Sequence, residues 1–220
     1  ISGGIDSAVA GAIAKRAFPE ECLGILMPCE SHQDDVRDGK LLAERFNIPY
    51  HVVSLDEPYR MLLTQYESFY TLEGEQGRLA RNNIKPRLRM LSLYYFAQVK
   101  NYLVVGTSNK SEITVGYATK YGDNAVDLQL LGDLLKDEVY ALAHYLKVPE
   151  EIIKRPPSAG LWAGQTDEGE MGFTYPEIAD YVRTGQGNPA VIEKIERMNR
   201  ISAHKRQLPP IAVIPEEVRA

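Results

Sequence analysis

Short apolar runs alternate with amphipathic segments along most of this chain. A short continuous apolar run bounded by turn residues is typical of a strand buried on both faces of a parallel sheet. The runs that predict strands are residues 22–27, 50–55, 103–106 and 125–131. The segments that predict helices are residues 7–16, 34–46, 59–70, 88–99 and 134–146, with shorter helices near residues 176–182 and 190–200. Strands and helices that alternate with short connections indicate a doubly wound α/β fold, in which ligands bind at the carboxyl ends of the strands.

The chain begins at Ile1, with no methionine and almost no strand before its first glycines. We therefore expect that a first strand, with or without an N-terminal helix, precedes this residue. The expected architecture is a mostly parallel five-stranded sheet flanked by helices and followed by short C-terminal helices. The length of 220 residues fits a single domain, residues 1–220.

Composition narrows the class of protein. The formal net charge of −5 argues against a broad basic face for nucleic acid, so we expect no nucleic-acid partner. No apolar run approaches the length that spans a membrane, so we expect no membrane partner either. The two cysteines, Cys22 and Cys29, are too few for a disulfide framework and are not spaced as a metal or redox pair. They fit the reducing environment of the cytoplasm.

The loop Ser2-Gly3-Gly4-Ile5-Asp6-Ser7 is the strongest local signal of chemistry. Two glycines between hydroxyl residues let the backbone approach an anion, and the small residues that follow begin a helix whose first amides point at the loop. A carboxylate beside phosphates repels them unless a divalent cation lies between, so Asp6 implies Mg²⁺. The alternative is a glycine turn capped by Ser or Asp before an ordinary helix.

Further candidate residues lie at other predicted strand and helix ends. Residues 81–90 hold several basic side chains, which are either ligands for an anion or solvated surface. Residues 107–112 place hydroxyls and a carboxylate at the end of a strand, and residues 117–123 form a loop that is either a binding loop or a plain turn. Lys136 lies near a helix start, where a cation is mildly unfavourable without an anion to bind. Residues 158–174 have no clear period and predict an active-site lid.

Together these blocks resemble a known family. The Ser-Gly-Gly-x-Asp-Ser loop resembles the pyrophosphatase loop of the ATP-pyrophosphatases (PP-loop superfamily), and it is not a Walker loop because no Gly-Lys-Ser/Thr follows. With the block at residues 83–90 and with Lys-Tyr-Gly-Asp (120–123), Thr-Asp-Glu (166–168) and His-Lys-Arg (204–206), the whole chain resembles the ammonia-dependent NAD synthetases. The resemblance implies an adenine nucleotide alpha-hydrolase-like fold and a homodimer. The implied reaction is a ligase reaction that converts nicotinic acid adenine dinucleotide, ATP and ammonia into NAD, AMP and pyrophosphate through an adenylated intermediate.

The resemblance also implies roles for individual residues. ATP contacts are expected from Ser2, Gly3, Gly4, Asp6, Ser7, Gln33, Thr107, Lys136 and Ser158. Mg²⁺ ligands are expected from Asp6 and Glu112. Dinucleotide contacts are expected from Asn83, Arg87, Tyr117, Lys120, Asp123, His204 and Lys205. The catalytic set is expected to be Asp6, Lys136, Asp167 and Glu170, with the acidic pair Asp167 and Glu170 handling the proton that ammonium sheds.

Two other classes of function compete with this one. Another ATP-pyrophosphatase, such as the synthetase part of a GMP synthetase or a tRNA-modifying enzyme, shares the first loop. A nucleotide-binding module without catalysis shares the fold, since fold does not fix function. The combination of Asp6, Glu112 and Lys136 argues against the module, because simple ATP binding does not demand that set of a metal ligand pair and a cation.

Overall fold

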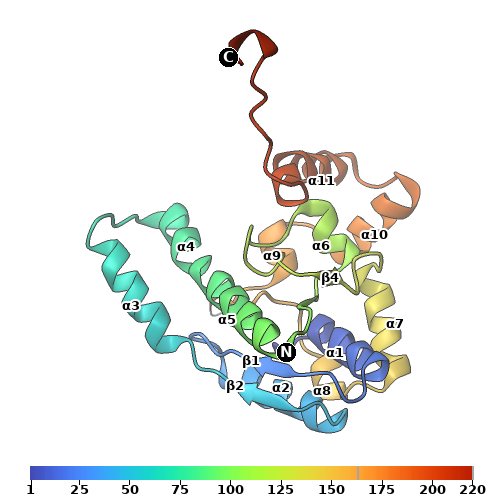
Figure 1. Cartoon of the computed structure of the whole chain (residues 1–220). Helices are drawn as coiled ribbons and strands as arrows, with labels where there is room; N and C mark the ends of the chain where they lie inside the picture. Colours follow the sequence, from blue (N-terminus) through green and yellow to red (C-terminus); the bar gives the residue numbers. More distant parts are fainter. Residues whose placement is uncertain (163, 220) are drawn as a thin grey trace.

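The structure is a computed structural model that describes residues 1–162 and 164–219. Four short strands lie among many helices (Figure 1). The strands are β1 (Gly24–Leu26), β2 (Tyr50–Val52), β3 (Val105–Gly106) and β4 (Leu128–Gln129). The longer helices are α1 (Ile5–Ala17), α2 (Gln33–Arg45), α3 (Asp56–Glu67), α4 (Gly74–Asn82), α5 (Ile84–Lys100), α7 (Lys136–Leu146), α10 (Tyr175–Thr184) and α11 (Pro189–Ile201). The shorter ones are α6 (Lys110–Val115), α8 (Glu150–Ile153), α9 (Asp167–Met171), η1 (Ala203–Lys205) and η2 (Glu216–Val218).

The strands form parallel pairs, as the continuous apolar runs predict. β1 pairs with β2 and β3 pairs with β4, each in parallel register. A single five-stranded sheet is not found within the described residues, which contain two two-stranded sheets. All four predicted strands are present, but each is shorter than its apolar run because only two or three residues of the run pair. The amino group of Ile1 donates a hydrogen bond to the carbonyl oxygen of Ile25 at 3.1 Å, so the chain start lies directly beside β1.

The largest buried cluster packs α1 against α7, α8 and α2. Small side chains on α1 allow close approach: Ala8, Val9 and Ala12 are almost fully buried. Their partners across the interface include Val139 and Ala143 of α7. This packing holds the first residues of α1 and of α7 near one another, which brings the glycine loop to Lys136.

A second cluster forms under the C-terminal helices. It joins the end of α6 to α9, α10 and α11 through Val115, Met171, Ile178 and Ile195. Helix α9 lies inside residues 158–174, which the sequence predicts to be irregular, and the predicted lack of regular structure is wrong for residues 167–171. Thr166 caps the helix by accepting a hydrogen bond from the Gly169 amide, a local signal that the Thr-Asp-Glu block contains.

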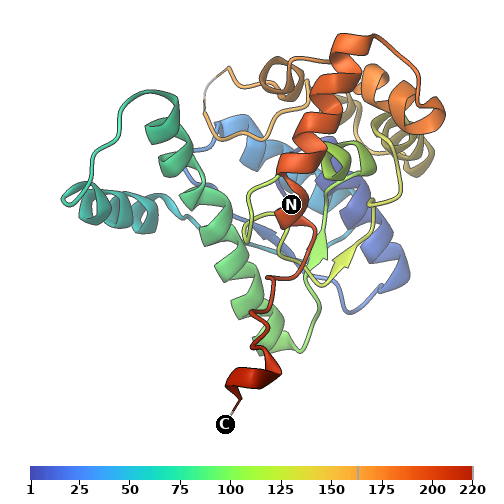
Figure 2. The ribbon, with the colours of Figure 1, turned by 90° about the horizontal axis from the view of Figure 1, so that it is seen from above.

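Helices α3 and α4 form an arm that extends from the body beside α5 (Figures 1 and 2). The sequence predicts α3 and α5 but places a break where α4 lies, because Gly74 and Gly77 indicate a turn. Gly74 does adopt a left-handed conformation, with φ of +69°, and α4 begins at that residue. None of the helices in the described ranges is long and apolar enough to cross a membrane.

Candidate active site

The glycine loop is held by its own serines. The Ser7 hydroxyl donates to the Gly4 carbonyl oxygen at 2.9 Å and accepts from the Ser2 hydroxyl at 3.0 Å. Gly3 has φ of +85°, a conformation that L side chains rarely adopt. A Cβ at this position would lie 2.5 Å from the carbonyl oxygen of Asp35 in the first turn of α2. The loop is therefore a fixed turn pressed on α2, with its amides at the start of α1.

An ion network ties α2 to the segment that follows α8. Arg155 donates to Asp35 at 2.6 Å and to the fully buried Asp38 at 2.9 Å, while Arg37 donates to Asp38 from the other side at 2.9 Å. Arg155 immediately precedes the prolines that begin the predicted lid. The network thus fixes where that segment leaves the body, next to the helix turn on which Gly3 rests.

Asp6 lies at the centre of the site. One carboxylate oxygen accepts from the Asn109 side-chain amide at 2.9 Å, and the other accepts from Lys136 Nζ at 2.6 Å. Lys136 is 3% exposed and is the first residue of α7. A positive charge at a helix start is unfavourable without an anion beside it, and Asp6 supplies that anion. Residues 130 positions apart meet here because α1 and α7 pack side by side.

Three carboxyl groups surround this lysine. Glu112 Oε1 lies 3.7 Å from Lys136 Nζ and accepts a hydrogen bond from the Tyr175 hydroxyl at 3.3 Å. The same hydroxyl lies 2.8 Å from Asp167 Oδ2. The other oxygen of Asp167, Oδ1, is buried without a hydrogen-bond partner in the described part of the chain. Asp6, Glu112, Lys136 and Asp167 are therefore brought together, as the expected catalytic and metal-binding roles require.

The charges of this cluster shift its proton affinities. Burial, followed by the charge of Asp6, raises the pKa of Glu112 to about 8. Burial also raises the pKa of Asp167. Burial alone lowers the pKa of Lys136, but the charges of Asp6 and Glu112 outweigh it and raise that pKa above its ordinary value. The lysine is charged at neutral pH, and the cluster around it has a surplus of acidic groups.

The donor set at Asp6 fits a magnesium ion shared with phosphates. Within residues 1–162 and 164–219, no group of three or more His, Cys, Asp or Glu side chains is arranged to hold a metal ion by itself. Mg²⁺ in phosphate-transferring sites is usually bound through one or two carboxylates together with substrate phosphates and water. Asp6 and Glu112 supply two such carboxylates beside the glycine loop.

A second group of predicted residues forms a rim around the loop at residues 117–123. The Asn83 side-chain oxygen accepts from the Thr119 hydroxyl at 2.8 Å, and Arg87 donates to the Lys120 carbonyl oxygen at 3.2 and 3.3 Å. Asp123 accepts from the Thr119 amide at 2.8 Å. In the described structure Arg87 and Lys120 have no carboxylate within ion-pairing distance, so their charges are available to an anionic ligand.

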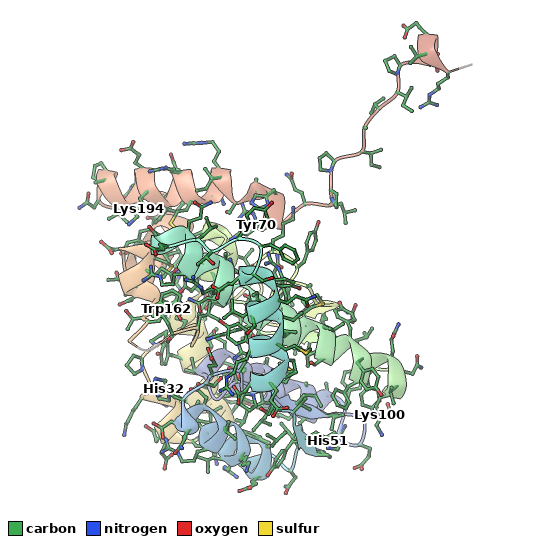
Figure 3. All side chains as sticks on the ribbon, turned by 90° about the vertical axis from the view of Figure 1, so that its left-hand side faces the viewer. His32, His51, Tyr70, Lys100, Trp162 and Lys194 are labelled. Atoms are coloured by element: carbon green, nitrogen blue, oxygen red, sulfur yellow. The ribbon has the colours of Figure 1, made fainter. Side chains whose placement is uncertain are left out.

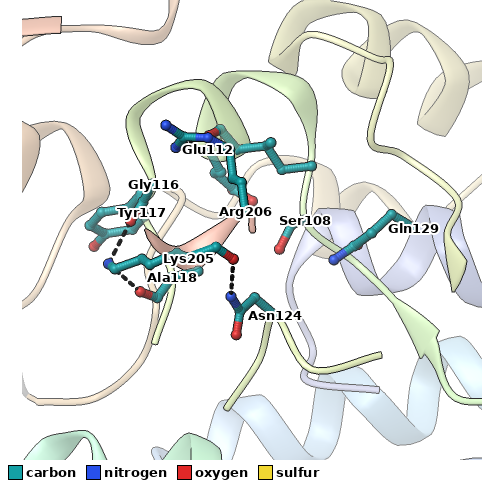
Figure 4. A pocket seen from close by; sticks show the side chains of 10 residues that line it. Ser108, Glu112, Gly116, Tyr117, Ala118, Asn124, Gln129, Lys205 and Arg206 are labelled. Atoms are coloured by element: carbon teal, nitrogen blue, oxygen red, sulfur yellow. Dashed lines mark hydrogen bonds between the residues drawn. The ribbon is translucent and has the colours of Figure 1, made fainter. Parts of the chain in front are cut away.

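Lys205 joins this rim from the C-terminal side. Its ammonium group donates to the carbonyl oxygens of Gly116 and Ala118 at 2.7 and 2.6 Å, and its own carbonyl oxygen accepts from Asn124 (Figure 4). These contacts enclose a cavity of about 180 Å³ between α6 and η1. Glu112, Tyr117 and Lys205 all line it, so the cavity runs from the acidic centre to the rim.

Tyr117 and Glu170 are also brought together. The Tyr117 hydroxyl donates to Glu170 at 2.7 Å, and the Gln165 amide contacts Glu170 at 2.8 Å. Burial, followed by the charge of Asp167, raises the pKa of Tyr117, which remains a neutral donor. Glu170 contacts Tyr117 and Gln165, whereas Asp167 contacts Tyr175, so the two acids expected to act as a pair have different hydrogen-bond partners.

Four other predicted residues make no such contacts in the described structure. Ser158 is exposed and accepts only from the Gly160 amide at 3.1 Å. His204 is exposed on η1, and Thr107 follows β3 without a side-chain hydrogen bond. Gln33 begins α2 and lines an open groove of about 530 Å³ with Ser31 and Arg37.

Sequence reasoning missed three residues of the site. Asn109 caps α6 in a reciprocal box with Glu112, a pattern that Asn-Lys-Ser-Glu displays in the sequence and that would have placed it beside the expected metal ligand. Tyr175 and Arg155 carry no comparable local signal, since their partners come from distant segments.

Comparisons with known proteins decide between the families that share the first loop. The family model described as NAD synthase matches residues 1–209. The chain belongs to the NAD synthase family. The NH(3)-dependent NAD(+) synthetase of Syntrophomonas wolfei is 61% identical over 219 residues, which cover 100% of this chain and 88% of that protein.

Solved structures of this family share the fold. The NMN synthetase of Francisella tularensis has a TM-score of 0.89 at 39% identity, with 98% of this chain and 87% of that chain covered. The NH3-dependent NAD synthetase of Campylobacter jejuni has a TM-score of 0.75 at 32% identity, covering 96% and 87%. The predicted NAD synthetase resemblance and the helix-rich α/β fold of this family are confirmed.

Proposed function

We propose that this NAD synthase family member is a ligase that amidates nicotinic acid adenine dinucleotide with ammonia and ATP, giving NAD, AMP and pyrophosphate. The observation that carries the proposal is the contact of Lys136 with Asp6 beside the glycine loop, with Glu112 next to both. A phosphate loop, a buried cation and two carboxylates at one point are the groups that phosphate chemistry with a divalent cation requires.

ATP contacts are proposed for the loop and its neighbours. The amides at the start of α1 and the hydroxyls of Ser2 and Ser7 face the β- and γ-phosphates, and Lys136 adds positive charge. Gly3 and Gly4 let the phosphates approach the backbone. Gln33, Thr107 and Ser158 are proposed at the remaining parts of the nucleotide, and their positions at the starts or ends of elements suit such contacts.

Asp6 and Glu112 are proposed to hold Mg²⁺, which when bound neutralises phosphate charge. Lys136 already contacts both carboxylates, and its ammonium group can instead donate to a phosphate oxygen. Asn109 and Tyr175 hold Asp6 and Glu112 in place during this exchange.

The acceptor is proposed to lie along the rim. Arg87, Lys120 and Lys205 supply positive charge for its pyrophosphate, and Asn83 and Asp123 shape the loop between them. Tyr117 and His204 offer rings to the pyridine end. The cavity of about 180 Å³ is lined by Glu112, Tyr117 and Lys205. We infer that the nicotinate carboxylate approaches the α-phosphorus of ATP from the side of Glu112.

The proposed chemistry needs no protein nucleophile. An oxygen of the nicotinate carboxylate attacks the α-phosphorus, and the bond to the β-phosphate oxygen breaks to release pyrophosphate. Ammonia then attacks the acyl carbon of this adenylate, AMP leaves, and one proton is lost to form the amide. Asp167, with an unpartnered buried oxygen, and Glu170 are proposed to accept protons as ammonium becomes ammonia.

A homodimer and a cytoplasmic location complete the proposal. Both free cysteines are compatible with a reducing compartment. Exposed apolar side chains on α5 support self-association, because Leu91, Tyr95 and Val99 lie on one face of that helix. Within this segment Ala97 is buried and Tyr95 is exposed, so part of the helix belongs to the core and part is open to the proposed partner.

A second candidate acceptor is nicotinic acid mononucleotide. The NMN synthetase of Francisella tularensis has a higher TM-score to this chain, 0.89, than the Campylobacter jejuni NAD synthetase, 0.75. Both acceptors present the same carboxylate to ATP. The dinucleotide has in addition an adenylate half, joined through the pyrophosphate that the rim is proposed to bind. The choice between them therefore depends on the rim rather than on the centre.

The deciding experiment measures pyrophosphate release and amide formation with ATP, Mg²⁺ and ammonium. The acceptors are the dinucleotide, the mononucleotide, xanthosine monophosphate and none. We expect NAD to form from the dinucleotide with a higher kcat/KM than NMN forms from the mononucleotide. A higher kcat/KM with the mononucleotide would make the mononucleotide the substrate. Pyrophosphate release with xanthosine monophosphate alone would contradict the proposal.

A further inference from the structure

The C-terminal tail (residues 208–219) projects from the body and carries apolar side chains into solvent (Figure 3). Leu208, Ile211 and Val213 are 91%, 88% and 85% exposed. In the described ranges, no hydrogen bond or ion pair joins the tail to the rest of the chain. Pro209, Pro210 and Pro215 favour an extended backbone and prevent the segment from forming a continuous helix.

A second unpartnered apolar surface lies on α5. Leu91, Tyr95 and Val99 follow one another at intervals of four residues, so they form a single stripe along the helix, and each is 64% exposed. The first turns of α5 pack on the arm and on the loop after β1 through Ile84 and Leu88, so the exposed stripe begins where this packing ends. We call Leu91, Tyr95 and Val99 the α5 stripe.

We propose that the tail of one copy packs on the α5 stripe of a second copy, so that two chains exchange their C-terminal arms. The proposal rests on the homodimer proposed above and adds the segment and the surface that form it. Each chain carries both the apolar tail and the α5 stripe, and a two-fold axis lets both tails bind at once. Twelve extended residues reach about 40 Å, which is enough to cross to a neighbouring subunit.

Charge selects the α5 stripe over the other exposed apolar surface, which lies on the α3–α4 arm. The end of the tail carries Glu216 and Glu217. Helix α5 contains basic residues and no acidic one, and Lys100 directly follows Val99 of the stripe. The α3–α4 arm instead carries more acidic than basic residues: Asp56, Glu57, Glu67, Glu73 and Glu75 against Arg60, Arg78 and Arg81. An acidic tail is attracted to the first surface and repelled by the second.

Arm exchange also reaches the proposed acceptor site. The tail begins three residues after Lys205, whose ammonium group holds the carbonyl oxygens of Gly116 and Ala118. An arm anchored on a partner restrains η1 from its C-terminal side, so association of the two copies steadies the rim of each site.

Photocrosslinking identifies the occupant of the stripe directly. A benzophenone amino acid replaces Val213 in the full chain, and isotopically heavy and light copies are mixed before illumination. We expect heavy-to-light crosslinks that map to residues 88–103. Crosslinks only within one copy, or crosslinks to the α3–α4 arm, would overturn the proposal. A protein that sediments as a dimer without crosslinking would also overturn it. So would a protein that stays monomeric at all concentrations up to about 100 µM.

Sedimentation of matched variants tests the energetics. We expect L91S/Y95S/V99S and a chain ending at Gln207 each to raise the dimer dissociation constant by at least about tenfold. Both changes remove the same interface, so the combined variant should have a dissociation constant no higher than the higher of the two single values. M61S/Y66S/F69S changes three similarly exposed residues of α3 and the turn after it and is the control, which should dimerise normally. Additive effects, or weakening confined to the control, would reject arm exchange. Circular dichroism verifies that each variant is folded. Neither crosslinking nor sedimentation measures catalysis, so both assays can be interpreted even if the proposed reaction is not found.

Discussion

The acidic centre and the rim hold their charged side chains in opposite ways. In the centre, Lys136 contacts both Asp6 and Glu112, so its positive charge is compensated inside the protein. At the rim, Arg87 and Lys205 donate to backbone carbonyl oxygens, which shape the loop without cancelling the charge. Substitutions in the centre should therefore change both the stability of the protein and its catalysis. At the rim, the positive charges stay available to an anionic ligand. Substitutions in the two regions should separate these effects.

The largest effect is expected in the centre. Asp6→Asn removes the proposed metal ligand and the main partner of Lys136, so we expect pyrophosphate release to fall by about 10³-fold or more, equivalent to about 4 kcal/mol. Lys136 still contacts Glu112, so the protein should remain folded with a loss of about 1–3 kcal/mol. Steady-state rates and urea unfolding measure the two quantities.

Asp34→Asn is the control for this change. Asp34 pairs with Arg37 at the surface, and the variant should keep both activity and stability within about 0.5 kcal/mol. Normal turnover by the Asp6→Asn variant would contradict the proposed role of Asp6 in metal binding and catalysis.

Two neighbouring glycines give the next test. Gly3→Ala forces a Cβ toward the Asp35 carbonyl oxygen at a φ of +85°, so we expect a loss of about 1–3 kcal/mol in unfolding free energy and a higher KM for ATP. At Gly4 the nearest atom to a Cβ is the Ser2 hydroxyl oxygen at 3.5 Å, so Gly4→Ala should cost about 1 kcal/mol or less. Equal costs at the two positions would contradict the close approach of the loop to α2.

The centre should also make stability depend on pH. Glu112 has its pKa raised from 4.5 to about 8, so the folded state binds more protons than the unfolded state between these values. Its contribution is full below about pH 4.5 and is lost as the pH rises through about 8. Without Mg²⁺, the unfolding free energy of the wild type should fall by up to about 1.4 kcal/mol per pH unit relative to Glu112→Gln. Parallel curves for the two proteins would show that the shift is absent.

The smallest effect is expected at the rim. Arg87→Met should raise the KM for the dinucleotide about fivefold, equivalent to about 1 kcal/mol, with little change in thermal stability. Arg197→Met, at an exposed position of α11, is the matched control. A large loss of stability in Arg87→Met with an unchanged KM would mean that the rim is structural.

The sequence predicted most of the elements and much of the centre for identifiable reasons. Continuous apolar runs locate all four strands, and the loop with Lys136 at a helix start indicates a cation beside phosphates. Helix α4 was missed because two glycines outweighed its short helical pattern. Contacts such as Tyr175 with Asp167 depend on how α9 and α10 pack, which no local pattern encodes. The roles of the individual residues with bound substrates stay predictions.

The contact between Asp6 and Lys136 also has a consequence for synthesis of the chain. The two residues are 130 positions apart, and at about 5–20 residues per second a ribosome takes roughly 7 to 26 seconds to travel between them. Throughout that interval the Asp6 carboxylate is hydrated, and the small apolar residues of α1 lack the α7 surface that buries them. The nascent chain therefore emerges with its phosphate loop made early and its charge centre completed only when α7 arrives.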